Sequence, residues 1–445
     1  MRPEFVRRMS SPVPRYTSYP TAASFKSNIG AVEFAESLAQ LSASTALSLY
    51  VHIPFCFKLC WYCGCNAKVA NNRETIAQYL EALEVEMTMV AALRTGWQPV
   101  SHIHWGGGSP NILAPSEISE LADSLRRLFT ISPTAEFAVE VDPRTFTAEQ
   151  AGAFAAAGVT RVSVGVQDFE PTVQKAINRE QSFETTRACI DLVRAAGIRG
   201  INIDLVYGLP HQTRSGLEQT IKQVLRLDPD RIALFGYAHL PSRIKHQALI
   251  DQAALPDAVE RFGQSQRARR LLTAAGYVPV GLDHFAKPDD PLASGPVRRN
   301  FQGYTTDTAD ALVGFGSSAI SMLPNGYFQN AVPVREYLKR VTDFGLATAR
   351  GLLLTDEDRV RAFVINRLMC DYEFSETAVR RAFGPLAADV INEADILLQS
   401  DQEGLVEKTP DGFRLTARGK PFVRAVAACF DTQTDHTAKA GSSGV

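Results

Sequence analysis

The sequence lacks a large excess of charge and any long apolar run. Its 46 lysines and arginines face 48 acidic residues, a net charge of −2, which argues against a generally basic nucleic-acid-binding protein. No apolar stretch approaches the roughly 20 residues that span a bilayer. The segment 1–16 has arginines but lacks the apolar core of a secretory signal. We therefore expect a soluble cytoplasmic protein, and because no coiled-coil pattern stands out we expect a monomer.

Cysteine is scarce along most of the chain and concentrated in one segment. Four of the seven cysteines lie within ten residues: Cys56, Cys60, Cys63 and Cys65. The other three, Cys189, Cys370 and Cys429, are solitary in helical patterns, so we expect them to be buried in the core. No second cysteine pair exists to complete a typical four-cysteine zinc site, and the spacing differs from that of ferredoxins. The odd, clustered count favours a metal site in a reducing compartment over a disulfide framework.

Short β-branched runs alternate with longer helical ones from about residue 47. Helices are predicted by apolar residues at three- and four-residue spacing, as in 76–93 and 214–227. The predicted strands are 47–55, 101–107, 136–143, 161–169, 201–208 and 231–240. Six βα units in series predict an α/β fold with a parallel sheet covered by helices. A partial (β/α)6 TIM-like barrel fits best, and a doubly wound sheet is the alternative.

The predicted strands end in polar or glycine-rich segments. "HIPFC", "WGGGSP", "EVDP", "GVQDF", "DLVYGLP" and "YAHLP" follow one strand each. Because ligands of βα folds bind at the carboxyl ends of the strands, these segments predict one shared site. Turn chemistry alone is the other explanation.

The alternation stops beyond about residue 350. Residues 357–370 and 376–384 are predicted helices, and 404–420 is a predicted hairpin followed by a helix. We expect an N-terminal arm (1–46), a catalytic domain (47–350), a small C-terminal helical, winged-helix-like domain (351–430) and a disordered tail (431–445). The wing of a winged helix can bind nucleic acid. Here, however, the basic residues are interleaved with acids, so we favour a structural or lid role. These basic residues are Lys408, Arg414, Arg418, Lys420 and Arg424.

The spacing Cys56-x3-Cys60-x2-Cys63 resembles the signature of the radical S-adenosylmethionine (SAM) superfamily. The resemblance implies that these three thiolates hold one [4Fe–4S] cluster whose fourth iron is chelated by SAM. One electron then cleaves SAM to a 5′-deoxyadenosyl radical; the hard chemistry belongs to the cofactor. "GGGSP" (106–110) matches the element that holds the methionine moiety. Cys65 would close the open iron if it were a ligand. We therefore expect it not to be one, and we expect its side chain to point away from Cys63.

Longer segments resemble a narrower family, the oxygen-independent coproporphyrinogen III oxidases. The resemblance covers about residues 12–432 and is most specific in "YVHIPFCFKLCWYCGCN" (50–66), "RYTSYPTA" (15–22) and "RNFQGYTT" (299–306). It implies oxidative decarboxylation of two propionates of coproporphyrinogen III to vinyl groups, giving protoporphyrinogen IX, with electrons from a flavodoxin or ferredoxin system. Related haem chaperones and other two-SAM enzymes, such as a methyltransferase-like relative, are the alternatives. A non-enzymatic cluster or zinc protein is a third class.

The resemblance also implies two bound SAM molecules. Residues matching those around the first are Tyr50, Gly107, Glu140 and Ile320. Residues matching those around the second are Tyr62, Gly108, Ser109, Gln167, Arg179, Asp204 and Ala238. Carboxylates can accept hydrogen bonds from ribose hydroxyls, and an arginine can pair with a carboxylate. Without the resemblance, Arg179 would be read as a surface ion pair, and His52, His102 and His104 as satisfied structural histidines.

A large tetracarboxylate substrate needs cations near the mouth of its cavity. We expect these from Arg15 in "RYTSYP" and from Arg298 or Arg299 before "NFQGYTT".

Overall fold

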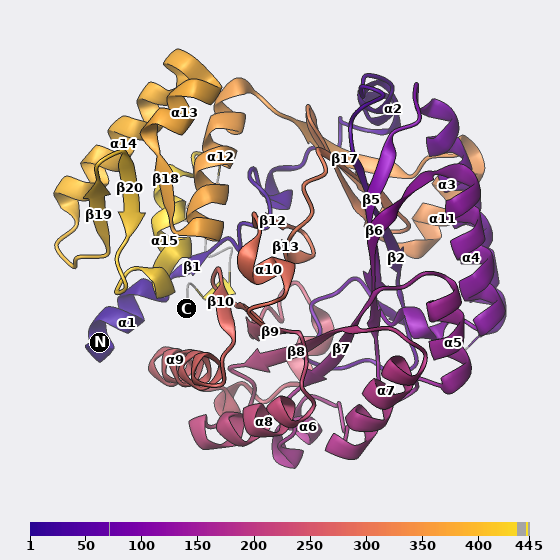
Figure 1. Cartoon of the computed structure of the whole chain (residues 1–445), viewed down its shortest axis with the longest axis horizontal. Helices are drawn as coiled ribbons and strands as arrows, with labels where there is room; N and C mark the ends of the chain where they lie inside the picture. Colours follow the sequence, from indigo (N-terminus) through magenta and orange to yellow (C-terminus); the bar gives the residue numbers. More distant parts are fainter. Residues whose placement is uncertain (71, 434–441, 444–445) are drawn as a thin grey trace.

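A computed structural model of the chain describes residues 1–70, 72–433 and 442–443. Its centre is a twelve-stranded mixed sheet in the described part of the chain. The six predicted strands are present as β2 (Leu47–Ile53), β5 (Pro99–Gly107), β6 (Thr130–Val141), β7 (Arg161–Gln167), β8 (Gly200–Tyr207) and β9 (Arg231–Gly236). Figure 1 shows helices along the outer rim of this sheet, and no described helix is both long and apolar enough to cross a membrane.

The strand order decides between the two predicted architectures. Neighbours in the sheet follow β9-β8-β7-β6-β5-β2, all parallel. Each new strand adds on the same side of the last one, whereas a doubly wound sheet reverses direction at a switch point. The partial barrel is therefore confirmed. A seventh parallel strand, β14 (Ala311–Phe315), lies beside β2, and antiparallel strands extend both edges.

Helices between the strands begin at side-chain caps that the sequence supplies. Thr147 caps α5 (Ala148–Ala156), Ser182 caps α7 (Phe183–Ala195) and Thr213 caps α8 (Arg214–Arg226), each accepting a backbone N–H three residues on. Asn72 caps α3 (Arg73–Leu93) by accepting the Glu74 N–H, two residues on, and α4 spans Pro115–Leu128. These caps fix where each connection leaves the sheet and enters the outer layer.

The two faces of the barrel strands carry different side chains. Val51, Ile103, Val139, Val162 and Ile203 belong to the main core, which lies between the sheet and the helices. The alternate positions carry polar groups: Tyr50, His104, Glu140, Ser163 and Asp204. Because successive strand residues point to opposite faces, the concave face of the barrel is polar. This is the face on which a site can be built.

The C-terminal segment forms its own core with part of the N-terminal arm. Helices α12 (Asp356–Asp371), α13 (Glu376–Phe383) and α14 (Ala388–Ser400) pack with a three-stranded sheet in the order β18 (Glu373–Ser375), β20 (Gly412–Leu415), β19 (Val406–Thr409). Phe5 of α1 (Pro3–Met9) joins this core edge-on to Phe422. Figure 1 shows α1 beside the C-terminal helices and strands at the left. The helical, winged-helix-like segment is thus present.

The predicted disordered tail (431–445) falls mostly outside the described residues. Where the chain is described, Asp431 is buried and accepts a hydrogen bond of 3.0 Å from the Tyr16 hydroxyl. Ser442–Ser443 (β21) pairs with β1 (Pro12–Val13). The expected disorder is therefore wrong for the described residues 431–433, which contact the rest of the chain.

The solitary cysteines do not all lie in the core. Cys189 and Cys370 are buried, as expected, but Cys429 is exposed. Its thiol donates back to the carbonyl of Ala425 at 3.6 Å, one turn earlier in the chain. The expectation was wrong for Cys429 because it follows α15 (Val423–Ala427) on the side that faces solvent.

Candidate active site at the carboxyl ends of the barrel strands

The cysteine loop leaves the end of β2. Cys60 is buried, and Cys56 and Cys63 are half-buried. The backbone N–H of Cys63 donates to the carbonyl of Cys60 at 3.2 Å, so the loop closes in a tight turn between these two cysteines. Among the described residues, no three His, Cys, Asp or Glu side chains lie close enough together to bind a single metal ion. A [4Fe–4S] cluster does not require that, since each thiolate binds a different iron.

Cys65 does not point away from Cys63. Its backbone N–H donates to Sγ of Cys63 at 3.4 Å, and a hydrogen bond between the two thiols lowers the pKa of Cys63 to about 7 and raises that of Cys65. The expected opposite orientation was wrong because side chains two residues apart lie on the same face even of an extended segment. Whether Cys65 ligates the cluster stays a prediction.

The glycine-rich segment after β5 lies against the cysteine loop. Gly108 N–H donates to the Ile53 carbonyl and Ser109 N–H to the Phe55 carbonyl, both at 2.8 Å. Gly107 has a φ of +108°, and a Cβ there would lie 2.4 Å from the His52 ring. A side chain therefore cannot be accommodated at Gly107. The Ser109 hydroxyl donates to Cys56 Sγ at 3.6 Å, so this segment contacts the first predicted ligand.

Tyr50, His104 and Glu140 form a polar row across three neighbouring strands. Tyr50 pairs with His104 in the register of β2 and β5, and Nε2 of His104 lies 2.9 Å from Oε1 of Glu140. Oε2 of Glu140 accepts the Gly107 N–H at 3.2 Å. Burial alone would raise the pKa of Glu140, but these hydrogen bonds and the neighbouring histidines lower it. Glu140 is therefore an ionised, half-buried acceptor on the concave face.

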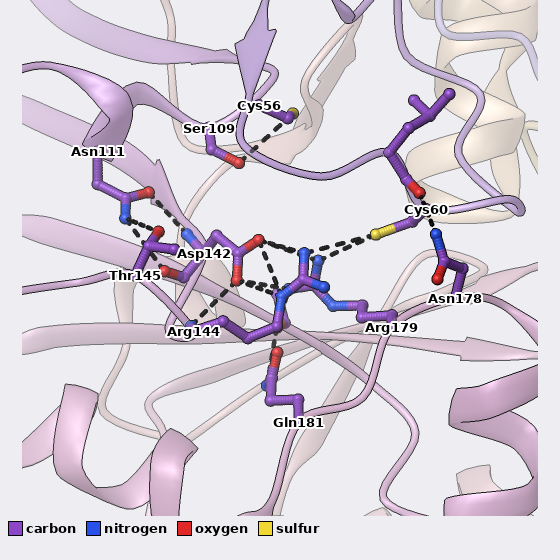
Figure 2. A network of polar contacts seen from close by, with 12 residues as sticks. Cys56, Cys60, Ser109, Asn111, Asp142, Arg144, Thr145, Asn178, Arg179 and Gln181 are labelled. Atoms are coloured by element: carbon purple, nitrogen blue, oxygen red, sulfur yellow. Dashed lines mark hydrogen bonds and ion pairs between the residues drawn. The ribbon is translucent and has the colours of Figure 1, made fainter. Parts of the chain in front are cut away.

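Asp142, directly after β6, holds two arginines beside Cys60, as Figure 2 shows. Arg144 contacts Asp142 at 2.5 Å and Arg179 contacts it at 3.4 Å. Arg179 is only 6% exposed, so it is not the surface ion pair that was the alternative. Its Nη2 donates to the Gly165 carbonyl at 2.7 Å, while its Nε is buried without a hydrogen-bond partner among the described residues.

Gln167 and Asp204 lie on the next two strands. Gln167 is buried with a φ of +69°, a left-handed conformation that non-glycine residues rarely adopt. Asp204 accepts hydrogen bonds of 2.8 Å from Ser163 and from Asn202. Burial raises the pKa of Asp204 to about 6, in contrast to Glu140. Two carboxylates of different acidity thus line the same concave face.

The remaining predicted cofactor residues surround these strands. Tyr62 belongs to the cysteine loop and packs against the cluster of Val206 and Tyr237. Gln247 donates to the carbonyls of both Tyr62 and Ala238, at 2.9 and 3.1 Å, and so ties the cysteine loop to the segment after β9. Ile320 begins β15 (Ile320–Leu323), on the other side of β2. The structure therefore distributes these residues around the strand ends.

A cationic cavity of about 260 Å³ lies between the barrel, the C-terminal domain and the N-terminal arm. Its charged lining comprises one acid and six cations: Asp283, Arg15, Arg261, Arg269, Arg299, Lys420 and Arg424. Arg299 is buried 3.7 Å from Asp283, and its Nε and Nη1 have no hydrogen-bond partner among the described residues. Tyr207 and Gly236 bring the ends of β8 and β9 into the wall. Such a lining suits an anionic ligand.

Of the arginines predicted for substrate, Arg15 and Arg299 line this cavity and Arg298 does not. Arg298 is exposed and donates to the Ala309 carbonyl at 3.0 Å. Consecutive residues of β12 (Arg298–Asn300) point to opposite faces, which separates Arg298 from Arg299.

The basic residues of the C-terminal domain divide into two groups. Three are paired with acids: Lys408 with Asp395, Arg414 with Glu407 and Arg418 with Glu403. The other two, Lys420 and Arg424, line the cavity. This distribution gives no continuous basic surface for nucleic acid, and the structural or lid role stays a prediction.

Sequence reasoning missed two parts of the site. Asp142 and Arg144 were visible only as polar residues after a strand, and nothing local links them to Cys60. Arg261 and Arg269 lie on α9 (Ala258–Ala274) and reach the cavity only through tertiary packing. His104 was expected to be a satisfied histidine and is one, but its partner Glu140 lies 36 residues away.

Comparisons with known proteins agree with this arrangement. The Radical SAM superfamily matches residues 50–224. The oxygen-independent coproporphyrinogen III oxidase of Bradyrhizobium diazoefficiens is 46% identical over 429 residues, covering 95% of each chain. That of Paracoccus denitrificans is 41% identical over 423 residues, covering 94% of each chain.

A solved structure is similar over nearly the whole chain. Coproporphyrinogen III oxidase from Escherichia coli, described as a radical SAM enzyme, superimposes with a TM-score of 0.90 and 41% identity. The match covers 94% of this chain and 98% of that one.

Proposed function

The chain belongs to the oxygen-independent coproporphyrinogen III oxidases, a family of radical SAM enzymes, and we propose how its residues serve that reaction. The substrate is coproporphyrinogen III, two propionates of which become vinyl groups without oxygen, giving protoporphyrinogen IX. When bound, the cluster and SAM supply a 5′-deoxyadenosyl radical that removes hydrogen from a propionate β-carbon. The observation that carries the proposal is the cationic cavity, which adjoins the strand ends carrying the predicted SAM residues.

Cys56, Cys60 and Cys63 are the three cluster ligands in this proposal. They share one loop, and the Ser109 hydroxyl and two arginines direct polar hydrogens at the sulfurs of Cys56 and Cys60. Thiolates accept such hydrogen bonds at cluster sites. Mössbauer spectra with and without SAM test the ligation. A unique iron site that responds to SAM is expected, and a cluster with four equivalent protein ligands would rule the proposal out.

Two SAM molecules are proposed to lie along the polar strand ends. The buried unpartnered Nε of Arg179 and the acceptors Glu140 and Asp204 fit carboxylate and ribose groups of this ligand. Gly106 leaves room for the Glu140 carboxylate, because a Cβ there would lie 2.5 Å from Oε1 of Glu140. Equilibrium dialysis of the reconstituted protein tests the count. We expect Asp204→Asn to reduce the bound SAM by one molecule per chain, and an unchanged count would contradict the assignment.

The cationic cavity is proposed to bind propionates of the substrate. Its 260 Å³ is below the roughly 300–1,000 Å³ of pockets that enclose a whole drug-sized ligand. It therefore suits one edge of the macrocycle, with carboxylates paired to Arg15, Arg299 and Arg424. The rest of the ring would extend along the strand ends toward Asp204, three residues before the cavity-lining Tyr207. Holding the unreacted propionates there would present the reacting ones to the radical.

The single electron for each SAM cleavage is proposed to come from a low-potential carrier of the flavodoxin or ferredoxin class. Reduction of the reconstituted cluster by either carrier, followed by optical spectroscopy, tests this proposal. Failure of both carriers under conditions in which dithionite reduces the cluster would contradict it.

A further inference from the structure

The two arginines beside Asp142 converge on one cysteine (Figure 2). Nη2 of Arg144 lies 3.6 Å from Sγ of Cys60, and Nη1 of Arg179 lies 3.5 Å from the same sulfur. By contrast, Cys56 receives one neutral donor, the Ser109 hydroxyl. Cys60 is thus the cysteine of this loop that faces two guanidinium groups.

The arginines are held in place by an anchored carboxylate. Asp142 accepts from Nε and Nη2 of Arg144 at 2.9 and 2.5 Å. Its backbone is itself fixed by Asn111, whose amide donates to the Asp142 carbonyl at 3.1 Å and accepts the Asp142 N–H at 2.9 Å. The side chains of Arg144 and Arg179 are 15% and 7% exposed. Water therefore screens their charges only partly.

We propose that Arg144, together with Arg179, raises the reduction potential of the cluster by donating N–H···S hydrogen bonds to the Cys60 thiolate. The inference rests on the proposed ligation by Cys56, Cys60 and Cys63. Reduction adds one electron and no proton to the [4Fe–4S] cluster, and a low-potential one-electron donor supplies it. Hydrogen bonds and positive charge at a ligating sulfur stabilise the more negative, reduced state. Arg144 is then a positioning residue that makes the cluster easier to reduce.

Arg144 separates this effect from SAM binding better than Arg179 does. Arg179 is among the proposed SAM contacts, so its replacement would change two properties at once. Among the described residues, the side chain of Arg144 instead donates hydrogen bonds only to Asp142 and Cys60. The alternative role for Arg144 is to neutralise Asp142, with no influence on the cluster.

An EPR-monitored redox titration of the reconstituted protein without SAM distinguishes the two roles. We expect Arg144→Gln to lower the equilibrium constant for cluster reduction about tenfold, or ~59 mV for a one-electron couple. Arg161→Gln is the matched control, because Arg161 is similarly buried, with a 13% exposed side chain, and pairs with Glu136 and Asp290. The reduction potential of the cluster in Arg161→Gln is expected to equal that of the wild type. Equal potentials in all three proteins would overturn the proposal.

A second variant keeps the test decisive if Arg144→Gln does not fold. Arg144→Lys retains a charge but loses the fork that reaches both Asp142 and Cys60, so a smaller drop in the equilibrium constant is expected and an unchanged one contradicts the proposal. Failure of the three-cysteine ligation would look different. The wild type itself would then show no SAM-responsive iron site, whatever its potential.

Discussion

The Nε2 atom of His104 lies 2.9 Å from Oε1 of Glu140, on the neighbouring strand. This contact fixes a half-buried carboxylate proposed to hold SAM, and it lowers the pKa of Glu140 against the opposing effect of burial. A residue that acts through Glu140 should be replaceable by another side chain able to make the same hydrogen bond.

We therefore expect His104→Leu to weaken SAM binding about tenfold, since the loss of one hydrogen bond to a charged group costs ~1.5–3 kcal/mol at a buried site and less where water replaces it. His104→Gln should restore most of the affinity. Isothermal titration of the reconstituted variants with SAM measures both. Equal affinities of the Leu variant and the wild type would show that Glu140 does not depend on His104.

Arg15 reaches the cavity from the N-terminal arm and donates to the Gly236 carbonyl at 3.0 Å. Arg15→Ala is expected to raise the KM for porphyrinogen about tenfold, because one charge-assisted contact is lost, while SAM cleavage by reductant alone changes little. Arg298→Ala is the control, since Arg298 lies outside the cavity lining. Equal loss of turnover and of SAM cleavage in Arg15→Ala would count against a substrate role.

Cys65 and Cys60 should differ sharply when replaced. Cys65→Ala is expected to retain the iron and sulfide content of the wild type, because three thiolates suffice for the proposed cluster. Cys60→Ala should lose most of its iron. Iron and sulfide analysis after anaerobic reconstitution measures this difference. Loss of the cluster in Cys65→Ala would make Cys65 a ligand and remove the open iron from the account.

Glu86 gives a pH-dependent contribution to stability. It is buried on α3 and accepts hydrogen bonds from Gly316 N–H, Tyr337 and Asn330, yet burial raises its pKa to about 7. The folded state binds this proton more tightly than the unfolded state, so stability should fall as pH rises from about 4.5 to 7, by up to ~3 kcal/mol. Above pH 7 the ionised Glu86 carboxylate lowers the free energy of unfolding by this full amount.

Glu86→Gln removes that titration. The melting temperature of the wild type relative to this variant should therefore decline between pH 5 and pH 7.5, as thermal unfolding at several pH values can show. Glu81→Gln, an exposed change on the same helix, should give a curve parallel to the wild type. Parallel curves for Glu86→Gln as well would contradict the raised pKa.

The sequence predicted the barrel well because its strands carry their own signals. The expected strand 47–55 is observed as Leu47–Ile53 and 161–169 as Arg161–Gln167, since β-branched runs and glycine breaks are local properties. The order of the strands in the sheet follows from the same pattern, because consecutive parallel strands with intervening helices usually lie side by side.

Residues of the site could be predicted only where they belong to a local motif or to a segment that resembles the family. Asp142 meets Arg179 across 37 residues, and Lys420 meets Arg15 in one cavity across most of the chain; no periodicity encodes such contacts. The orientation expected for Cys65 was wrong for a local reason. Side chains two residues apart share one face of an extended segment, and the Cys65 N–H donates to Sγ of Cys63.

The most direct test of the account is anaerobic incubation of the reconstituted protein with coproporphyrinogen III, SAM and reductant. The account predicts protoporphyrinogen IX, with one 5′-deoxyadenosine formed for each new vinyl group. A protein with an intact cluster that cleaves SAM but leaves coproporphyrinogen III unchanged would contradict it.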